Sequence, residues 1–80
     1  MTVYTRVGCH LCEQALNALG RLGDEVPFEL RTVDIEADEQ LHRAYLERIP
    51  VIALDGEELY DFFVDEADLR RRLEARVSAT

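Results

Sequence analysis

The two cysteines of the chain, Cys9 and Cys12, are separated by two residues in the stretch RVGCHLCEQ. Such a pair can hold a metal ion, form a structural disulfide or act as a redox-active dithiol. A structural disulfide is disfavoured, because a bond across so short a loop hardly restricts the unfolded chain. A metal site needs further ligands, for which the candidates in this chain are His10, His42 and carboxylates. A site shared by two chains, or an iron–sulfur cluster completed by an external thiol, therefore stays open beside the dithiol.

The elements predicted on either side of the cysteine pair favour the reactive dithiol. Residues 2–6 are β-branched and aromatic, which predicts a short strand, and apolar residues recur at helical spacing from Leu11 onward. Cys9 then lies at the start of a helix, where free backbone N–H groups and the helix dipole stabilise a thiolate. Cys12 lies one turn further on, with its side chain directed back toward Cys9. This arrangement suits thiol–disulfide exchange, in which Cys9 attacks a substrate disulfide and Cys12 resolves the mixed disulfide.

The rest of the chain predicts strands and helices in an α/β order. Asp55-Gly56 is a two-residue hairpin signal, and Pro50 cannot continue the helix expected before it. The expected elements are strands at residues 2–6, 28–35, 51–54 and 57–62, with helices from residue 11, at residues 38–48 and from residue 65. We therefore expect residues 1–80 to form one domain of order β-α-β-α-β-β-α, with a four-stranded, partly parallel sheet covered by three helices.

The composition narrows the classes of partner. Apolar residues make up 48% of the chain and charged residues 32%, which is typical of a globular domain. The formal net charge of −8 disfavours phosphate backbones and anionic lipids, so we expect neither nucleic acid nor a membrane as partner. No apolar run approaches the ~20 residues of a membrane span. The stretch MTVYTRVG lacks the features of a secretory signal, so a cytoplasmic location is expected.

Three stretches of the sequence together resemble the glutaredoxins of the thioredoxin-like superfamily. YTRVGCHLC is similar to the start of that family, RIPVI is similar to the stretch that holds its cis-proline, and VDIEAD is similar to the acidic turn after its second strand. The three stretches lie within roughly residues 2–60. The resemblance implies a thioredoxin-like fold with a four-stranded mixed sheet and three helices. It also implies an oxidoreductase that transfers electrons between disulfides and maintains cell redox homeostasis.

The resemblance assigns roles to individual residues. It implies that Cys9 is the nucleophile and Cys12 the resolving thiol. Pro50, with Ile49 before it, matches the cis-proline that packs beside the nucleophile. Val51 matches the residue whose backbone pairs with a bound thiol peptide, an interaction of the strand-addition kind.

Charged residues complete the site that the resemblance implies. Arg6 matches the basic residue that meets a carboxylate of glutathione, and Arg48 is a candidate for a second positive group, the alternative for both being an ordinary surface arginine. His10 is expected either as an exposed helix residue or, when protonated, as a stabiliser of the Cys9 thiolate. Asp65 is a candidate to present a carboxylate at a helix start, although a helix N-cap is the simpler role.

The sequence departs from the glutaredoxin pattern in two places. Many glutaredoxins carry Pro-Tyr between the cysteines, where this chain has His10-Leu11. The family's Gly-Gly-Asp motif is replaced by the bulkier LYDFFVDEADL, which removes the glycines that admit the γ-glutamyl end of glutathione. This departure favours a protein disulfide as substrate and a thioredoxin reductase as electron donor, with glutathione as the alternative donor and co-substrate.

No tightly bound cofactor is expected for this reaction. Small-molecule disulfides are further candidate substrates. The protein is expected to be a monomer. Two functions of another class stay open. The fold could serve as a binding module without turnover, or the CxxC pair could carry a metal or an iron–sulfur cluster.

Overall fold

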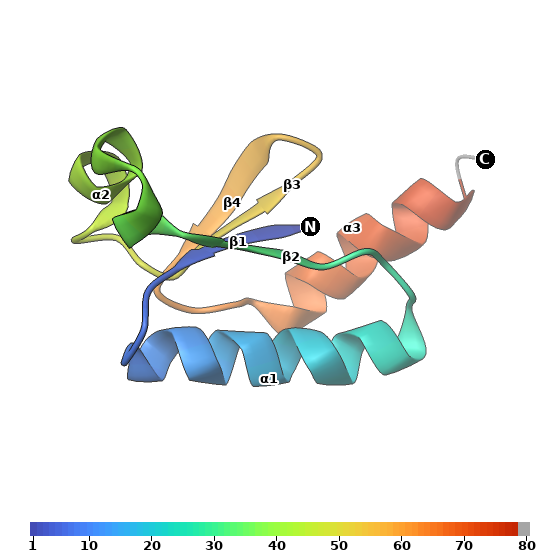
Figure 1. The fold of residues 1–80 in the computed structure, drawn as a ribbon. Coiled ribbons are helices and arrows are strands. Elements are labelled where there is room, and N and C mark those ends of the chain that lie inside the picture. Colours follow the sequence, from blue (N-terminus) through green and yellow to red (C-terminus); the bar gives the residue numbers. More distant parts are fainter. Residues whose placement is uncertain (79–80) are drawn as a thin grey trace.

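The computed structural model describes the backbone of residues 1–78 and the side chains through residue 76. Its elements follow the predicted order, with one short 3-10 helix in addition (Figure 1). They are β1 (Thr2–Thr5), α1 (His10–Glu25), β2 (Arg31–Asp34), η1 (Ile35–Ala37), α2 (Glu39–Tyr45), β3 (Val51–Leu54), β4 (Glu57–Asp61) and α3 (Glu66–Ser78). No helix of the described residues is long and apolar enough to span a bilayer.

The four strands form one mixed sheet in the order β2-β1-β3-β4. β1 pairs in parallel with β2 and antiparallel with β3, and β3 pairs antiparallel with β4. Because successive side chains of a strand point to opposite faces, the Val3–Ile52 pair and the Tyr4–Val51 pair lie on different faces of the sheet. Figure 1 shows α1 and α3 on one side of the sheet and α2 on the other, near the end where β1 leads into α1.

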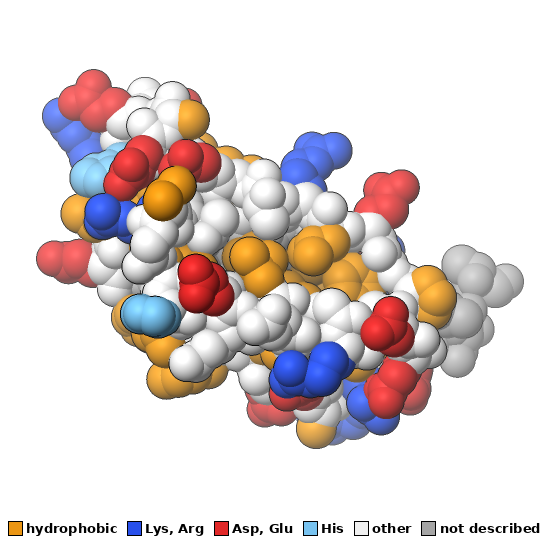
Figure 2. All heavy atoms as spheres, turned by 60° about the horizontal axis from the view of Figure 1, so that its bottom comes forward, with side chains coloured by type: hydrophobic (Ala, Val, Ile, Leu, Met, Phe, Trp, Pro, Cys, Tyr) orange, Lys and Arg blue, Asp and Glu red, His pale blue; other side chains and the backbone are white. Residues whose placement is uncertain are grey.

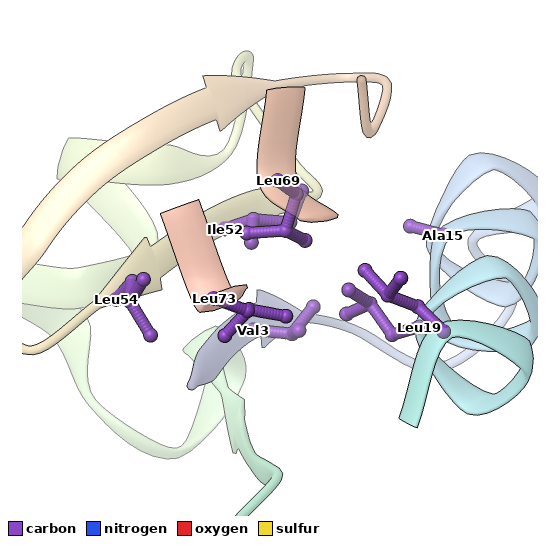
Figure 3. Packing of buried hydrophobic residues seen from close by; sticks show 8 residues of the cluster. Val3, Ala15, Leu19, Ile52, Leu54, Leu69 and Leu73 are labelled. Carbon is purple, nitrogen blue, oxygen red and sulfur yellow. The ribbon is translucent and has the colours of Figure 1, made fainter. Parts of the chain in front are cut away.

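The main core lies between the sheet and the helices α1 and α3. Figure 3 shows Leu69 and Leu73 of α3 beside Ile52 and Val3, with Leu19 of α1 facing them. All five side chains are buried. Their burial anchors α1 along its length, and with it the helix start that carries the cysteine pair.

The second strand is shorter than the predicted range of residues 28–35. It can pair only as far as its partner β1 extends, and its ladder begins where Thr2 meets Arg31, next to a hydrogen bond from the Arg31 N–H to the Met1 carbonyl (2.8 Å). Phe28 instead packs against the main core and lies beside Gly23 of α1. The pattern of residues 28–30 therefore reflects packing against a helix rather than strand pairing.

The helices also differ from their predicted bounds. α1 runs through Gly20 and Gly23, where the sequence predicted a loosened end, because Leu19 and Leu22 hold this part of the helix in the core. α2 starts after Asp38, whose carboxylate accepts the N–H of Gln40 (2.8 Å), but it ends at Tyr45 rather than near residue 48. The following residues form turns that lead into the extended approach to Pro50.

The two exposed glycines Gly20 and Gly56 are expected to respond to alanine in opposite directions. Gly56 has φ +84° in the β3–β4 turn, so Gly56→Ala should lower the free energy of unfolding by about 1–2 kcal/mol. Gly20 lies inside α1, so Gly20→Ala should raise it by about 0.5–1 kcal/mol. No described atom lies within 4 Å of either added Cβ, which leaves backbone conformation as the cause. Urea unfolding of both variants measures the difference, and equal shifts would contradict this explanation.

Candidate active site

The cysteine pair lies where β1 turns into α1. Gly8, with φ +82°, makes the turn, and Cys9 is the N-cap of α1 in an extended conformation. The Cys12 N–H donates to the Sγ of Cys9 at 3.1 Å, and the two sulfurs are joined as a disulfide with Cα atoms 5.2 Å apart. Cys9 is half-buried, whereas Cys12 is only 1% exposed. The predicted positions of both cysteines are confirmed, and Cys9 is the sulfur nearer to solvent.

This geometry favours the thiolate form of Cys9 once the disulfide is reduced. A backbone N–H points at its sulfur, and the positive end of a 16-residue helix begins beside it. Cys12, buried one turn further into the helix, can reach the sulfur of Cys9 but has little contact with solvent. The pair therefore combines a partly accessible sulfur with an enclosed one.

A second, smaller apolar cluster joins the cysteine pair to a distant part of the sequence. Cys12 is buried together with Ile35 and Ile49, and Cys9, Tyr4, Leu41 and Tyr45 pack against them. The Ile49–Pro50 peptide bond is cis, as expected from the RIPVI stretch, and Pro50 is fully buried. The cluster brings Ile49 into contact with the cysteine pair, and a substrate-binding role for Ile49 and Pro50 stays a prediction.

Val51 does not lie at a free sheet edge. In the central strand β3 it is paired with Tyr4 on one side and Asp61 on the other. The prediction that a bound peptide pairs with the backbone of Val51 is therefore wrong, because β1 and β4 already occupy both sides of this residue. Ile49 and Pro50 directly precede β3 and lie outside its strand pairing. The Pro50 carbonyl nevertheless accepts the N–H of Phe62 (2.8 Å).

Arg48 is held in a network of side chains that the sequence did not predict. Its guanidinium contacts both oxygens of Asp61 at 3.1 Å and Oε1 of Glu58 at 2.6 Å. It also lies over the ring of Tyr45, 5.3 Å from the ring centroid, while the Tyr45 hydroxyl donates to Glu58 at 2.7 Å. Tyr45 in turn stacks on Tyr4 of β1, with ring centroids 4.4 Å apart. The network ties the end of α2, just before Ile49, to strand β4.

No local pattern in the sequence marks this network, because its hydrogen-bonded partners lie 10–13 residues apart in the chain. The one usable signal was the hairpin, whose register puts Glu58 opposite Ala53 and Asp61 opposite Val51, on the face that α2 covers. A substrate role for Arg48 stays a prediction, and its charge is compensated by two carboxylates in the structure.

The hydrogen bonds of this network change the pKa values of Glu58 and Tyr45. The hydrogen bonds from Arg48 and Tyr45 lower the pKa of Glu58, and accepting by Glu58 raises the pKa of Tyr45 to about 12. A carboxylate whose pKa is lowered by folding stabilises the folded state at any pH above its pKa in the unfolded chain, which for Glu58 is about 4.5. This stabilisation is lost as the pH falls through the lower pKa of the folded state. Tyr45 contributes in the opposite range, because its stabilisation is present below pH 10 and is lost as the pH rises toward 12.

Glu58→Gln should make the free energy of unfolding fall less steeply than in the wild type as the pH drops below about 4.5. The pair is partly exposed, so the difference should not exceed about 1 kcal/mol. Glu57→Gln is the matched control, because Glu57 neighbours Glu58 on β4 and is exposed. Urea unfolding between pH 3 and pH 7 measures the slopes. A Glu58→Gln slope equal to that of the wild type would contradict the pKa shift.

The other predicted charged residues have local partners. Arg6 forms an ion pair with Glu36 (3.1 Å) of the VDIEAD stretch, so it does not stand as an uncompensated charge. The His10 side chain is 94% exposed and lies 3.8 Å from Glu13, which agrees with an ordinary surface histidine. Asp65 accepts the N–H of Asp68 (3.1 Å), so it caps α3 as the simpler reading predicted. Binding roles of these residues toward glutathione stay predictions.

Among the described residues, no group of three or more His, Cys, Asp or Glu side chains gathers as a metal site would require. The residues that the structure brings to the cysteine pair are apolar: Ile35, Ile49, Tyr4, Leu41 and Tyr45. The site therefore consists of two sulfur atoms at the start of α1 that pack against a cluster of apolar side chains.

The chain is similar to proteins of several bacteria. Residues 1–74 match the family described as "Glutaredoxin-like domain (DUF836)". The uncharacterized protein Rv0508 of Mycobacterium tuberculosis is 34% identical over 71 residues, which cover 82% of this chain and 73% of the relative. The uncharacterized protein Mb0520 of Mycobacterium bovis matches with the same identity and coverage.

Two solved structures are similar in both fold and sequence. The solution NMR structure of protein Ne2328 from Nitrosomonas europaea has a TM-score of 0.76 at 37% identity, covering 89% of this chain and 86% of that one. The X-ray structure of protein XcR50 from X. campestris has a TM-score of 0.76 at 39% identity, covering 92% and 95%. These likenesses confirm the α/β thioredoxin-like fold, and together with the cysteine pair they fit a thioredoxin-fold redox protein. With residues 1–74 of its 80 residues matched, the chain belongs to the glutaredoxin-like domain family.

Proposed function

We propose that the protein is a thiol–disulfide oxidoreductase in which Cys9 is the nucleophile and Cys12 the resolving thiol. The observation that carries this proposal is the position of the Cys9 sulfur. It lies at the N-cap of α1, accepts the Cys12 N–H at 3.1 Å, and is bonded to the sulfur of a nearly inaccessible cysteine. Membership of the glutaredoxin-like family supports the same chemistry.

The reaction begins with the dithiol form. The Cys9 thiolate attacks one sulfur of a substrate disulfide, a new S–S bond forms, and the other substrate sulfur leaves as a thiolate that takes up a proton. The Cys12 thiolate then attacks the Cys9 sulfur, which releases the second substrate thiol and leaves the Cys9–Cys12 disulfide. The substrate has gained two electrons and the protein has lost two. The order follows from exposure, since Cys12 is 1% exposed and meets Cys9 more readily than a substrate.

The Cys9–Cys12 disulfide must be reduced again by two electrons. We propose a thioredoxin reductase as the donor, with glutathione as the alternative co-substrate, and a protein disulfide rather than a small one as the main substrate. The support is the loop after β4, which carries Phe62 and Phe63 in the stretch LYDFFVDEADL that stands in place of the Gly-Gly-Asp motif. A monomer acting in the cytoplasm, where thiols are kept reduced, fits this cycle.

Alkylation of the Cys12→Ser variant tests the nucleophile directly, since Cys9 is then the only thiol. The rate with iodoacetamide should reach half its maximum at least about one pH unit below the ~8.5 of a free cysteine, because the helix start stabilises the thiolate. The same variant unfolded in urea is the control and should behave as an ordinary cysteine. A half-maximal rate at pH 8.5 or above in the folded protein would contradict the proposal.

A further inference from the structure

The loop between β4 and α3 exposes two phenylalanines beside the candidate active site. Phe62 is 40% exposed and Phe63 is 68% exposed. Phe62 has φ +67°, a conformation that bulky L-residues rarely adopt, and its N–H donates to the Pro50 carbonyl at 2.8 Å. The loop is therefore fixed next to Pro50. Backbone strain of this kind is found preferentially at functional sites.

A hollow of about 170 Å³ lies between this loop and α1. Its apolar walls are Leu11, Ala15 and Ala18 of α1 together with Phe62, Phe63 and Val64. Leu11 stands between Cys9 and Cys12 in the sequence, so one wall of the hollow comes from the turn of α1 that carries the cysteine pair. The volume is below the range of roughly 300–1,000 Å³ that is typical of small-molecule pockets, and it suits a single large side chain.

The surroundings of the hollow are mainly acidic. Glu66 lies in its wall opposite Arg21, at 3.7 Å, so these two charges compensate each other. Glu13 and Asp65 are exposed and flank the wall residues Gln14 and Val64 in the sequence. Figure 2 shows, on the face turned toward the viewer, hydrophobic side chains at the surface with both acidic and basic side chains around them. A partner that fills the hollow would be favoured by basic residues at its edges.

We propose that this hollow, formed by Leu11, Phe62, Phe63 and Val64 with the small residues of α1, binds a large apolar side chain of a protein substrate. That side chain would lie beside the half-cystine that Cys9 attacks, with basic residues flanking it. The inference rests on the proposed function and names its substrate class. Exposed aromatic residues supply large contact area at interfaces at low entropic cost, whereas phenyl rings offer no partner to the charged γ-glutamyl group of glutathione.

Steady-state reduction of three disulfides by the full chain tests the inference. The first is hydroxyethyl disulfide, the second a peptide disulfide with phenylalanine beside the cysteine and lysine on either side, and the third the same peptide with serine in place of phenylalanine. The wild type should reduce the phenylalanine peptide with a KM about tenfold below that of the serine peptide. Phe63→Ser should remove this preference and change kcat/KM for hydroxyethyl disulfide by less than about twofold.

Val7→Ser is the matched control, because Val7 is an exposed apolar residue two positions before Cys9 and does not line the hollow. It should keep the preference for the phenylalanine peptide. Equal KM values for the two peptides in the wild type, or an unchanged preference in Phe63→Ser, would overturn the inference while the reduction of hydroxyethyl disulfide upholds the proposed function. Failure to reduce any of the three disulfides would overturn the proposed function and this inference with it.

Discussion

Cys9→Ser is expected to abolish disulfide reduction, with kcat/KM lowered at least about 1,000-fold, because a hydroxyl cannot form the mixed disulfide. Cys12→Ser should keep the first step, since Cys9 remains at the N-cap of α1 with a backbone N–H near its sulfur. With the reductase as donor the mixed disulfide should then accumulate, because no internal thiol resolves it. The rates follow from a coupled assay with hydroxyethyl disulfide under each of the two donors, glutathione and a thioredoxin reductase.

Far-UV circular dichroism separates loss of chemistry from loss of fold. Serine is close to cysteine in size, and Cys9 is only half-buried, so Cys9→Ser should keep the secondary structure of the wild type. A Cys9→Ser variant with wild-type activity would show that the nucleophile lies elsewhere. A Cys12→Ser variant that turns over as fast as the wild type with the reductase as donor would show that Cys12 does not resolve the mixed disulfide.

Leu19→Ala should lower the free energy of unfolding by about 2–5 kcal/mol. The side chain of Leu19 is fully buried between α1 and the sheet, where it meets the cluster that contains Val3, Ile52 and Leu69 (Figure 3). A cavity there weakens the contact that holds α1, the helix that carries both cysteines. Total stabilities of domains are about 5–15 kcal/mol, so this single change removes a large share.

Leu30→Ala is the matched control for this prediction, since it makes the same chemical change at a side chain that is 43% exposed. It should shift the free energy of unfolding by no more than about 0.5 kcal/mol. Urea unfolding followed by circular dichroism gives both values. Equal losses in the two variants would contradict the assignment of Leu19 to the core.

The local features of the fold could be predicted because each depends on residues close together in the sequence. Asp55-Gly56 forms the β3–β4 turn with φ +52° and +84°, the conformation that favours this residue pair. Asp38 and Asp65 cap helices as acidic residues before helical patterns do. The bounds that were wrong depend on distant partners. β2 begins only at Arg31, where its ladder with β1 starts at Thr2, and Leu19 with Leu22 carries α1 past Gly20.

In the candidate site, too, the features that depend on nearby residues could be predicted, and those that depend on distant contacts could not. The spacing of Cys9 and Cys12 and the start of a helix predicted their arrangement, and the RIPVI stretch pointed to the cis-proline. The pairing of Arg48 with Glu58 and Asp61 could not be predicted, because it depends on how α2 lies over the sheet. Val51 was expected at an edge, yet the strand order puts β3 in the interior of the sheet.

Mass spectrometry of the trapped intermediate tests the central claim most directly. Reduced Cys12→Ser protein is mixed with hydroxyethyl disulfide, quenched with acid and mapped by peptide. We expect one mercaptoethanol adduct per chain, at Cys9, whereas the reduced wild type treated in the same way should give the Cys9–Cys12 disulfide with no adduct left. A Cys12→Ser protein that forms no adduct would contradict Cys9 as the nucleophile, and a wild type that keeps its adduct on Cys9 would contradict Cys12 as the resolving thiol.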